Sequence, residues 1–214
     1  MHTIEVKDIP YQADSAPLFA ALRDLPEAIW LDSGKPKSLQ GCFDIISTSP
    51  DALIETNGQL STIYEGNTTG SSDADPFLLA KQLLEPLLPI DPSIDAPFVG
   101  GLLGYFGYDL GRRVIGIDDL TDTVTDLPDM RLGRYLWSLV VNHQSRRSQL
   151  FFHQQCPAAL QQDICERLDR AMHTNQPEPD LSFKLLQPFA PTLTRQQYRE
   201  SIGTIKNYIA SGDC

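Results

Sequence analysis

The sequence is poor in the residues that build metal sites and disulfide frameworks. It has only 4 cysteines and 4 histidines in 214 residues. No two cysteines have Cys-x-x-Cys spacing and no histidine pattern suggests zinc, so we expect reduced thiols and no metal site. The histidines are scattered, and none accompanies a marked serine or cysteine. We therefore predict no catalytic residues in this chain.

Positive charge and long apolar runs are also scarce. Lysine and arginine total 17 against 28 acidic residues, which gives a net charge of −11. Such a chain is a poor match for nucleic acid or an anionic membrane surface. No run of about 18 apolar residues could span a bilayer. The first eight residues lack the basic flank and apolar stretch of a signal peptide, so we predict a cytoplasmic protein without nucleic-acid or membrane partners.

The hydrophobic content of 41% is sufficient for a core. Alternating or continuous apolar runs predict strands over residues 3–9, 28–31, 43–48, 52–56, 60–64, 136–141 and 150–152. Helical spacing and capping residues predict helices from residues 15, 75, 157 and 194 onward. Asn57-Gly58 is a strong hairpin signal, and Glu65 to Ala74 is expected to be a loop. Strands that come in hairpins indicate an α+β fold with antiparallel sheet.

Residues 100–113 form a glycine-rich segment with aromatic residues between the glycines. The segment lacks Gly-Lys-Ser/Thr and Gly-x-Gly-x-x-Gly, so a phosphate-binding loop is not favoured. Because glycine has no Cβ, another backbone can approach it closely. We predict a closely packed internal segment in which Tyr105, Phe106 and Tyr108 fill the gaps.

The sequence Gly-Tyr-Phe-Gly-Tyr-Asp-Leu-Gly-Arg-Arg over residues 104–113 resembles a signature of aminodeoxychorismate synthase component I. This family is related to anthranilate synthase component I. Further matches follow in family order at residues 30–34, 43–46, 127–130 and 208–214. The resemblance implies an antiparallel β-sandwich with flanking helices, built from both halves of a longer chain.

The resemblance also implies a function. The family converts chorismate and ammonia, supplied by a glutaminase partner, to 4-amino-4-deoxychorismate in 4-aminobenzoate and folate synthesis. Its chorismate-binding, Mg²⁺-binding and catalytic groups lie in the C-terminal half. We therefore expect this chain to be a catalytically silent N-terminal portion, with no cofactor of its own. The expected organisation is an α+β domain over residues 1–174, a linker over 175–193, and the first helix of the chorismate-binding half over 194–214.

The family keeps one ligand site in this half, a pocket for tryptophan. The positions that match it are Leu31, Ser33, Gln40, Gly41, Cys42 and Phe43. A serine hydroxyl can bind the charged end of an amino acid, and an aromatic or aliphatic side chain can pack on the indole ring. The other interpretation is that Ser33 only ends a strand and Phe43 belongs to the core.

Two alternative functions stay open. One is the N-terminal portion of anthranilate synthase component I with a tryptophan feedback site. The other is a stand-alone, non-catalytic module that binds an amino acid. Leu-Asp-Ser at residues 31–33 and Gly-Arg-Arg at 111–113 favour the aminodeoxychorismate synthase branch.

Overall fold

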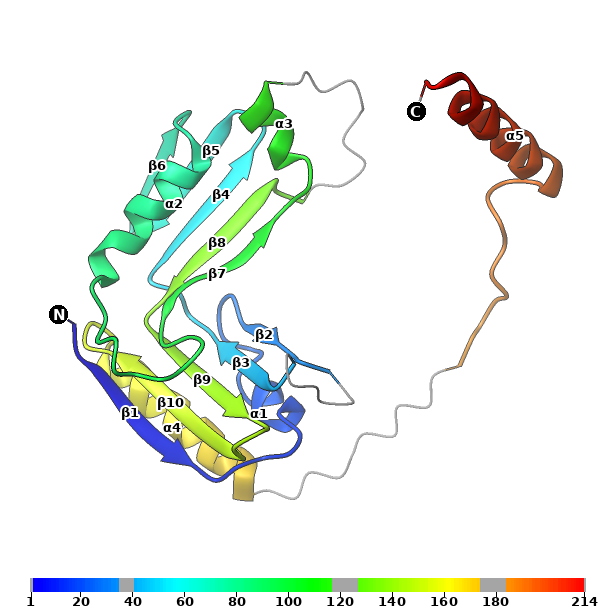
Figure 1. Ribbon diagram of the computed structural model, residues 1–214. Coiled ribbons are helices and arrows are strands. Elements are labelled where there is room, and N and C mark those ends of the chain that lie inside the picture. The colour runs from blue at the N-terminus through cyan, green and yellow to red at the C-terminus, as the bar shows by residue number, and fades with distance from the viewer. Residues whose placement is uncertain (1, 35–40, 117–126, 174–183, 214) are drawn as a thin grey trace. The chain divides into compact units, whose positions relative to one another are not determined.

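The computed structural model describes residues 2–34, 41–116, 127–173 and 184–213 (Figure 1). The chain divides into two compact units, Met1–Asn175 and Gln176–Cys214. The first unit holds the two β-sheets and helices α1 to α4, and the second holds α5 (Arg195–Ser211). The expected linker over residues 175–193 is described only from residue 184, and from there to residue 193 the chain is exposed and forms no helix or strand.

Both sheets are antiparallel and five-stranded. The first has the spatial order β1 (Ile4–Ile9), β10 (Arg147–His153), β9 (Trp137–Asn142), β3 (Phe43–Ser47), β2 (Ile29–Leu31). The second has the order β6 (Thr68–Ser72), β5 (Leu60–Glu65), β4 (Ala52–Asn57), β8 (Met130–Tyr135), β7 (Gly101–Phe106). The α+β class with antiparallel sheet, predicted from the hairpin pattern, is confirmed.

The chain passes between the two sheets at two places. Residues 48–51 connect β3 to β4, and the single buried residue Leu136 connects β8 to β9. Strands β8 and β9 therefore form a nearly continuous ribbon that belongs to both sheets (Figure 1). Each sheet contains one strand of each connected pair.

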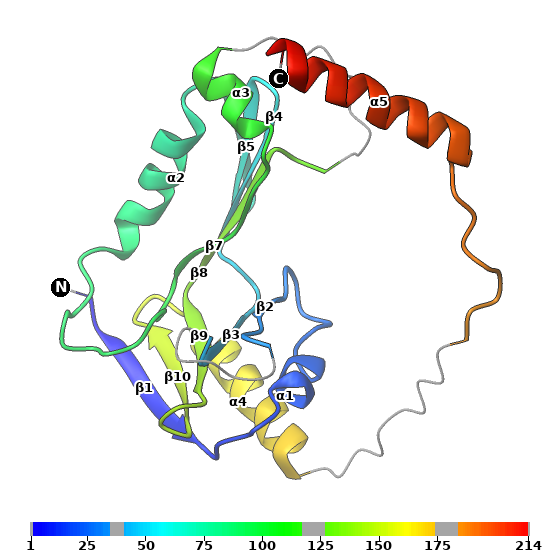
Figure 2. The ribbon, with the colours of Figure 1, turned by 45° about the vertical axis from the view of Figure 1, so that its right-hand side comes forward.

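Two helices cover one face of the first sheet. Helix α4 (Ala158–His173) and the short α1 (Ala16–Ala20) pack on the same side (Figure 2). The apolar residues of α4 recur at helical spacing, and Ile164 and Leu168 are buried against the sheet. Trp137 of β9, the largest fully buried side chain, lies in the same cluster.

The second sheet is covered by α2 (Pro76–Leu84), which continues into a single 3₁₀ turn. The Asp75 carboxylate caps the helix by accepting a hydrogen bond from the Phe77 N–H at 2.7 Å. Leu79 and Leu83 are buried in one cluster with apolar residues of β4 and β8. The cluster also contains the first residue of α3 (Leu110–Ile115).

The glycine-rich segment forms β7 and the turn before α3. At Gly104 the backbone φ is +155°, and a Cβ there would lie far inside contact distance of the Arg131 carbonyl oxygen. The Gly107 N–H donates to the Asp129 carbonyl oxygen at 2.6 Å. The close backbone approach predicted from the glycines is confirmed.

The aromatic residues of this segment do not fill the predicted gaps. The side chains of Tyr105, Phe106 and Tyr108 are exposed, Tyr108 by 99%. The reason is that β7 is an edge strand, so the end of the strand and the turn after it reach solvent. Phe106 stacks on Phe77 of α2, with ring centroids 5.5 Å apart. The prediction that these aromatic side chains fill gaps inside the protein is therefore wrong.

The hairpin predicted at Asn57-Gly58 joins β4 to β5 as expected. The next segment, expected to be a loop over residues 65–74, instead contains β6, which pairs with β5. Its threonine, glycine and serine residues are mostly exposed, so no apolar alternation marked the strand. Backbone hydrogen bonds to β5 alone define it, which is typical of a polar edge strand.

The second unit contains the helix predicted from residue 194. Thr194 and Gln197 form the predicted capping box, and Gly212 ends the helix in the left-handed conformation. None of the helical residues is buried.

Candidate functional site

The predicted tryptophan-pocket residues lie where β2 ends and β3 begins. Leu31 is the last residue of β2 and pairs across the sheet with Ile45. Phe43, the first residue of β3, shares a face with Ile45 because side chains alternate along a strand. This face is opposite to the one covered by α1 and α4, and Leu31 is 44% exposed on it. Gln40 lies outside the described residues.

Gly41 and Cys42 lead into β3. Cys42 is a buried free thiol, and its carbonyl oxygen accepts a hydrogen bond from the His143 N–H at 2.8 Å. Phe43 packs against an apolar cluster that includes Val140 and Phe151 of the neighbouring strands. The structure thus places the apolar candidates Leu31 and Phe43 on one face and the buried Cys42 at the start of the strand.

Ser33 belongs to a buried polar cluster centred on Asp44. The Asp44 side chain is only 1% exposed. Its Oδ1 accepts from the Ser33 N–H at 3.0 Å and from the Ser33 hydroxyl at 2.7 Å. Its Oδ2 accepts from the Ser15 hydroxyl at 2.6 Å and lies 2.7 Å from Nε2 of His143. These bonds join the start of α1, the end of β2, β3 and the turn after β9.

The cluster continues through His143 to Tyr11. The Tyr11 hydroxyl lies 3.0 Å from Nδ1 of His143. Because an ionised carboxylate carries no hydrogen, Nε2 of His143 must donate to Asp44. The guanidinium group of Arg146 lies over the Tyr11 ring, 5.3 Å from its centroid. The His143 imidazole is therefore hydrogen-bonded through both of its ring nitrogens.

The electrostatics of Asp44 follow from these contacts. Burial alone would raise the pKa of the carboxyl, but the hydrogen bonds from Ser15, Ser33 and His143 together hold the pKa well below its usual range. Asp44 is an anion throughout the neutral pH range. The arrangement is not a catalytic triad, because the serine hydroxyls donate to the carboxylate and neither is bonded to the imidazole.

Sequence reasoning named Ser33 but missed Asp44, Ser15, His143 and Tyr11 as its partners. One signal was available: Asp44 stands between Phe43 and apolar residues in a predicted strand. A carboxylate in that position requires hydrogen-bonding partners. The identity of the partners depends on contacts between distant parts of the sequence, 99 residues apart in the case of His143.

A second buried charge lies in the other sheet. The Arg134 side chain is 7% exposed, and its guanidinium group binds both carboxylate oxygens of Asp51 at 2.9 and 2.7 Å. It also donates to Glu65 at 2.7 Å and to the Leu83 carbonyl at 3.1 Å. These contacts join β8 to the connection before β4, to β5 and to α2, so we assign Arg134 a structural role.

Among the described residues, we also looked for metal-binding clusters, reactive thiols and membrane-spanning helices. Among those residues, no group of three or more histidine, cysteine or acidic side chains is arranged to hold a metal ion. Burial, with a smaller contribution from the charge of Asp51, raises the pKa of the Cys156 thiol to about 11, which keeps it protonated and unreactive at neutral pH. No described helix has both the length and the apolar character needed to cross a membrane.

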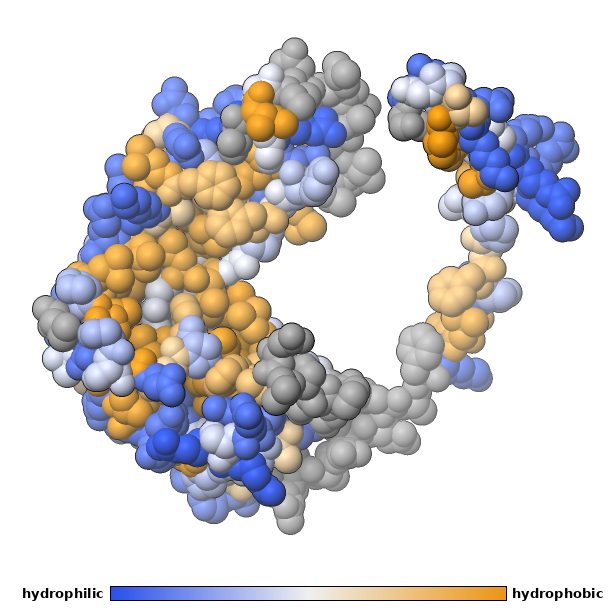
Figure 3. Space-filling view, in the orientation of Figure 1, coloured by the Kyte–Doolittle hydropathy of each residue, from blue (hydrophilic) through white to orange (hydrophobic). Residues whose placement is uncertain are grey.

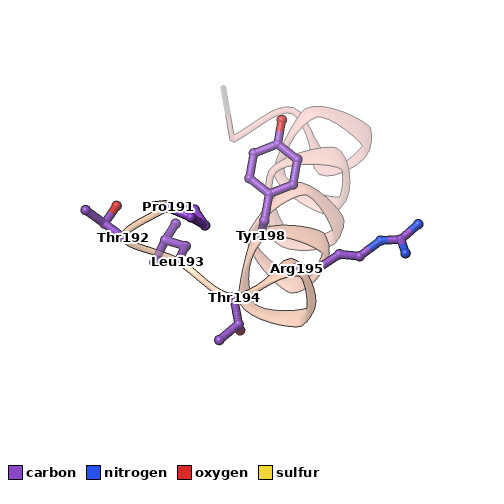
Figure 4. Close-up of a pocket in the computed structure, with 6 residues that line it drawn as sticks. All are labelled: Pro191, Thr192, Leu193, Thr194, Arg195 and Tyr198. Atoms are coloured by element: carbon purple, nitrogen blue, oxygen red, sulfur yellow. The ribbon is translucent and has the colours of Figure 1, made fainter. Parts of the chain in front are cut away.

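One shallow hollow lies in the second unit, at the N-terminus of α5 (Figure 4). It is lined by Pro191, Thr192, Leu193, Thr194, Arg195 and Tyr198. Arg195, the one charged residue of this set, points away from the other side chains (Figure 4). The hollow is formed by exposed residues close together in sequence, and we assign it no function.

The first unit also carries an exposed apolar area around α2 and β7 (Figure 3). Its large exposed members are Phe77 and Phe106, whose rings stack on each other, and Leu78 of α2. Contiguous apolar area of this kind is typical of a surface that packs against another part of a protein.

Comparison with known proteins identifies the class to which this fold belongs. The family model described as chorismate binding enzyme matches residues 26–214. The chain therefore belongs to the chorismate binding enzyme family. A crystal structure of anthranilate synthase component I from Streptococcus pneumoniae TIGR4 shares the fold, with a TM-score of 0.57 at 21% identity. That similarity covers 84% of this chain and 42% of the other.

Within the family, the chain is similar to proteins named aminodeoxychorismate synthase component 1. Identity is 37% over 209 residues to the protein from Klebsiella aerogenes, and 34% over 199 residues to that from Escherichia coli K12. These matches cover 96% and 92% of this chain but only 44% and 42% of the relatives. Anthranilate synthase component 1 from Pseudomonas putida is 26% identical over 216 residues. The chain thus spans less than half the length of the relatives that it matches.

Proposed function

We propose that this chain is the N-terminal portion of an aminodeoxychorismate synthase component 1. The observation that carries the proposal is the difference in identity: three proteins of that name are 33–37% identical and a fourth is 28% identical, against 26–27% for anthranilate synthases. The whole protein would convert chorismate and ammonia to 4-amino-4-deoxychorismate in the cytoplasm. A glutaminase component would supply the ammonia, and Mg²⁺ would bind with chorismate in the C-terminal half.

The role proposed for the described residues is mainly structural. The exposed apolar area around α2 and β7 supports this, because a portion of a larger domain should present such a surface to the remainder. The relatives, which are more than twice as long, have ample chain to cover it.

The test of this function is the product formed by the full natural protein. With chorismate, ammonia and Mg²⁺, we expect it to form 4-amino-4-deoxychorismate, whereas the 214-residue chain alone should form no product. Product identity by chromatography and mass spectrometry separates the alternatives. Anthranilate from the full protein would establish the anthranilate synthase alternative, and turnover by the 214-residue chain would contradict our placement of the active site.

We further propose that the face at Leu31, Phe43 and Ile45 forms part of a tryptophan site, together with Ser33, Gln40, Gly41 and Cys42. The supporting observation is that an apolar row, in which Leu31 is exposed and Phe43 and Ile45 are half-buried, ends next to the polar Ser33. An amino acid with an aromatic side chain needs both kinds of surface.

Replacement of Ser33 by alanine should weaken tryptophan binding by the full natural protein. Loss of one hydrogen bond to a charged group lowers affinity by about ten- to a hundredfold. Calorimetric titration measures the effect, with circular dichroism to check that the fold is intact. Equal affinity would remove Ser33 from the site, and no binding to the unmodified protein would contradict the tryptophan site altogether.

A further inference from the structure

Two histidines meet where β1 begins and β10 ends. The centroids of the His2 and His153 rings are 5.0 Å apart. His153, the last residue of β10, is 1% exposed and pairs across the ladder with Ile4 of β1. Because β1 is the edge strand of the first sheet, the His2 ring lies against a buried imidazole at that edge.

The hydrogen bond of His153 fixes the protonation of its ring. Nδ1 accepts from the backbone N–H of Gln155 at 3.2 Å. A backbone N–H can only donate, so Nδ1 carries no hydrogen and the ring is neutral, with its hydrogen on Nε2. Nε2 is buried and has no hydrogen-bond partner among the described residues. A second hydrogen on this ring would break its hydrogen bond to Gln155 and place a charge in a buried position.

Gln154 fixes His2 in the same way. The side-chain oxygen of Gln154 accepts from the Thr3 N–H at 3.1 Å, so its amide nitrogen is the atom that lies 2.7 Å from Nδ1 of His2. An amide nitrogen can only donate, which leaves Nδ1 of His2 as the acceptor. The Gln154 N–H also donates to the Thr3 carbonyl oxygen at 3.0 Å. Both imidazoles therefore accept from a donor that cannot change its role.

We propose that His2, His153 and Gln154 form an acid-sensitive clasp that holds the start of β1 on the end of β10. Protonation at either Nδ1 replaces an acceptor by a donor that faces another donor. Two imidazolium rings at this separation would also repel each other. Acid should therefore release the start of β1 from β10 before the sheets unfold. The clasp is separate from the proposed tryptophan site and does not depend on it.

The surroundings of His153 determine the pH range in which the clasp opens. Burial, followed by the charge of His2, lowers the pKa of His153, and the charge of Asp51 opposes this shift only in part. Asp51 is itself bound by the guanidinium group of Arg134. The Cys156 thiol, whose N–H donates to the His153 carbonyl oxygen, is uncharged at neutral pH because its pKa is raised to about 11.

Three further charged residues close to the clasp in the chain are engaged elsewhere. Glu5 and Lys7 of β1 pair with each other at 3.2 Å, and they point to the other face from Ile4 because side chains alternate along a strand. Asp91 follows Ile90, the residue that forms a bridge with His2, and its carboxylate accepts from the Ser93 N–H at 2.9 Å.

The sign of the pH dependence follows from the lowered pKa of His153. In the open form the ring meets solvent and regains its ordinary pKa of about 6.5. Below that pH the open form binds more protons than the closed form, until the pH reaches the lower pKa of the closed form. The clasp is therefore most stable above about pH 6.5 and weakens as the pH falls below it.

Hydrogen exchange on the full natural protein measures this opening, by mass spectrometry of peptides that cover residues 2–9. Protection, expressed relative to the intrinsic exchange rate at each pH, should fall about three- to tenfold between about pH 7.5 and 5.5. In His153→Asn this fall should be largely lost. An asparagine oxygen can still accept from the Gln155 N–H, and it does not become charged.

His173→Asn is the matched control. His173 is also a histidine of the first unit, at the end of α4, but its side chain is 73% exposed. This variant should keep the full pH dependence of the unmodified protein. His2→Asn removes the second ring and its charge, and should reduce the pH dependence without abolishing it, so the clasp can be tested even if His153→Asn does not fold.

Two results would overturn the proposal. One is protection of residues 2–9 that stays constant between about pH 7.5 and 5.5 in the unmodified protein. The other is a fall of the same size in the unmodified protein and in either His153→Asn or His2→Asn, because the acid-sensitive group would then lie outside the clasp.

Discussion

Replacement of Gly104 by valine should lower the free energy of unfolding by roughly 2–6 kcal/mol. Two effects add at this position. A Cβ would overlap the Arg131 carbonyl oxygen in the backbone of the neighbouring strand, and overpacking of this kind costs about 1–3 kcal/mol. The backbone φ of +155° is also unfavourable for a residue with a side chain, at a cost of about 1–3 kcal/mol. Because the clashing atom is backbone, no side-chain rotation relieves it.

Urea denaturation followed by circular dichroism measures this loss, and Gly70→Val supplies the control. Gly70 lies in β6, the other edge strand of the same sheet, and a Cβ there would have no atom within 4 Å. We expect its midpoint to change little or to rise, because valine favours extended backbone. Equal midpoints for the two variants would show that the contact between β7 and β8 is looser than described.

The second large effect is expected at Arg134, where Arg134→Met should cost roughly 2–4 kcal/mol of unfolding free energy. The substitution keeps most of the buried stem but removes the guanidinium group from Asp51, Glu65 and the Leu83 carbonyl. Breaking one side of a buried ion pair costs about 3–5 kcal/mol. The expected value is lower because the side chains of Asp51 and Glu65 are 33% and 56% exposed and water can solvate them.

Arg147→Met is the matched control for this experiment. Arg147 also lies in a strand and pairs with an aspartate, Asp8, at 3.0 Å, but both side chains are more than half exposed. Its loss should change stability by less than about 1 kcal/mol. If the two arginine variants had the same midpoint in urea, burial would not distinguish these ion pairs, and our structural assignment of Arg134 would be wrong.

The parts of the fold that sequence patterns predicted are those defined by local chemistry. Asn57-Gly58 requires a tight turn, Asp75 caps a helix, and Thr194 with Gln197 forms a capping box, so each is readable over a few residues. Strand β6 was missed because its polar side chains carry no burial pattern and only its pairing with β5 defines it. Tyr105 and Phe106 were misjudged because no local pattern shows that β7 lies at a sheet edge.

The candidate site divides in the same way. Leu31, Ser33 and Phe43 were named because they match positions of the family's tryptophan pocket, and the structure shows that Leu31 and Phe43 lie on one face of the sheet. The hydrogen-bonding role of Ser33 was not predictable, because it depends on Asp44 and, beyond it, on a histidine 99 residues further along the chain. The hydrogen-bonding partners of a polar side chain are set by such tertiary contacts, and residue type alone leaves them open.

The ribbon formed by β8 and β9 has a consequence for how the first unit opens. Since only Leu136 separates the two strands, neither sheet can lose this central ribbon without pulling on the other. Local opening should therefore be confined to the outer strands β1, β2, β6 and β7, while the amide hydrogens of β8 and β9 exchange with solvent only through global unfolding. The two sheets should then unfold as one cooperative unit, although no single strand is hydrogen-bonded into both of them.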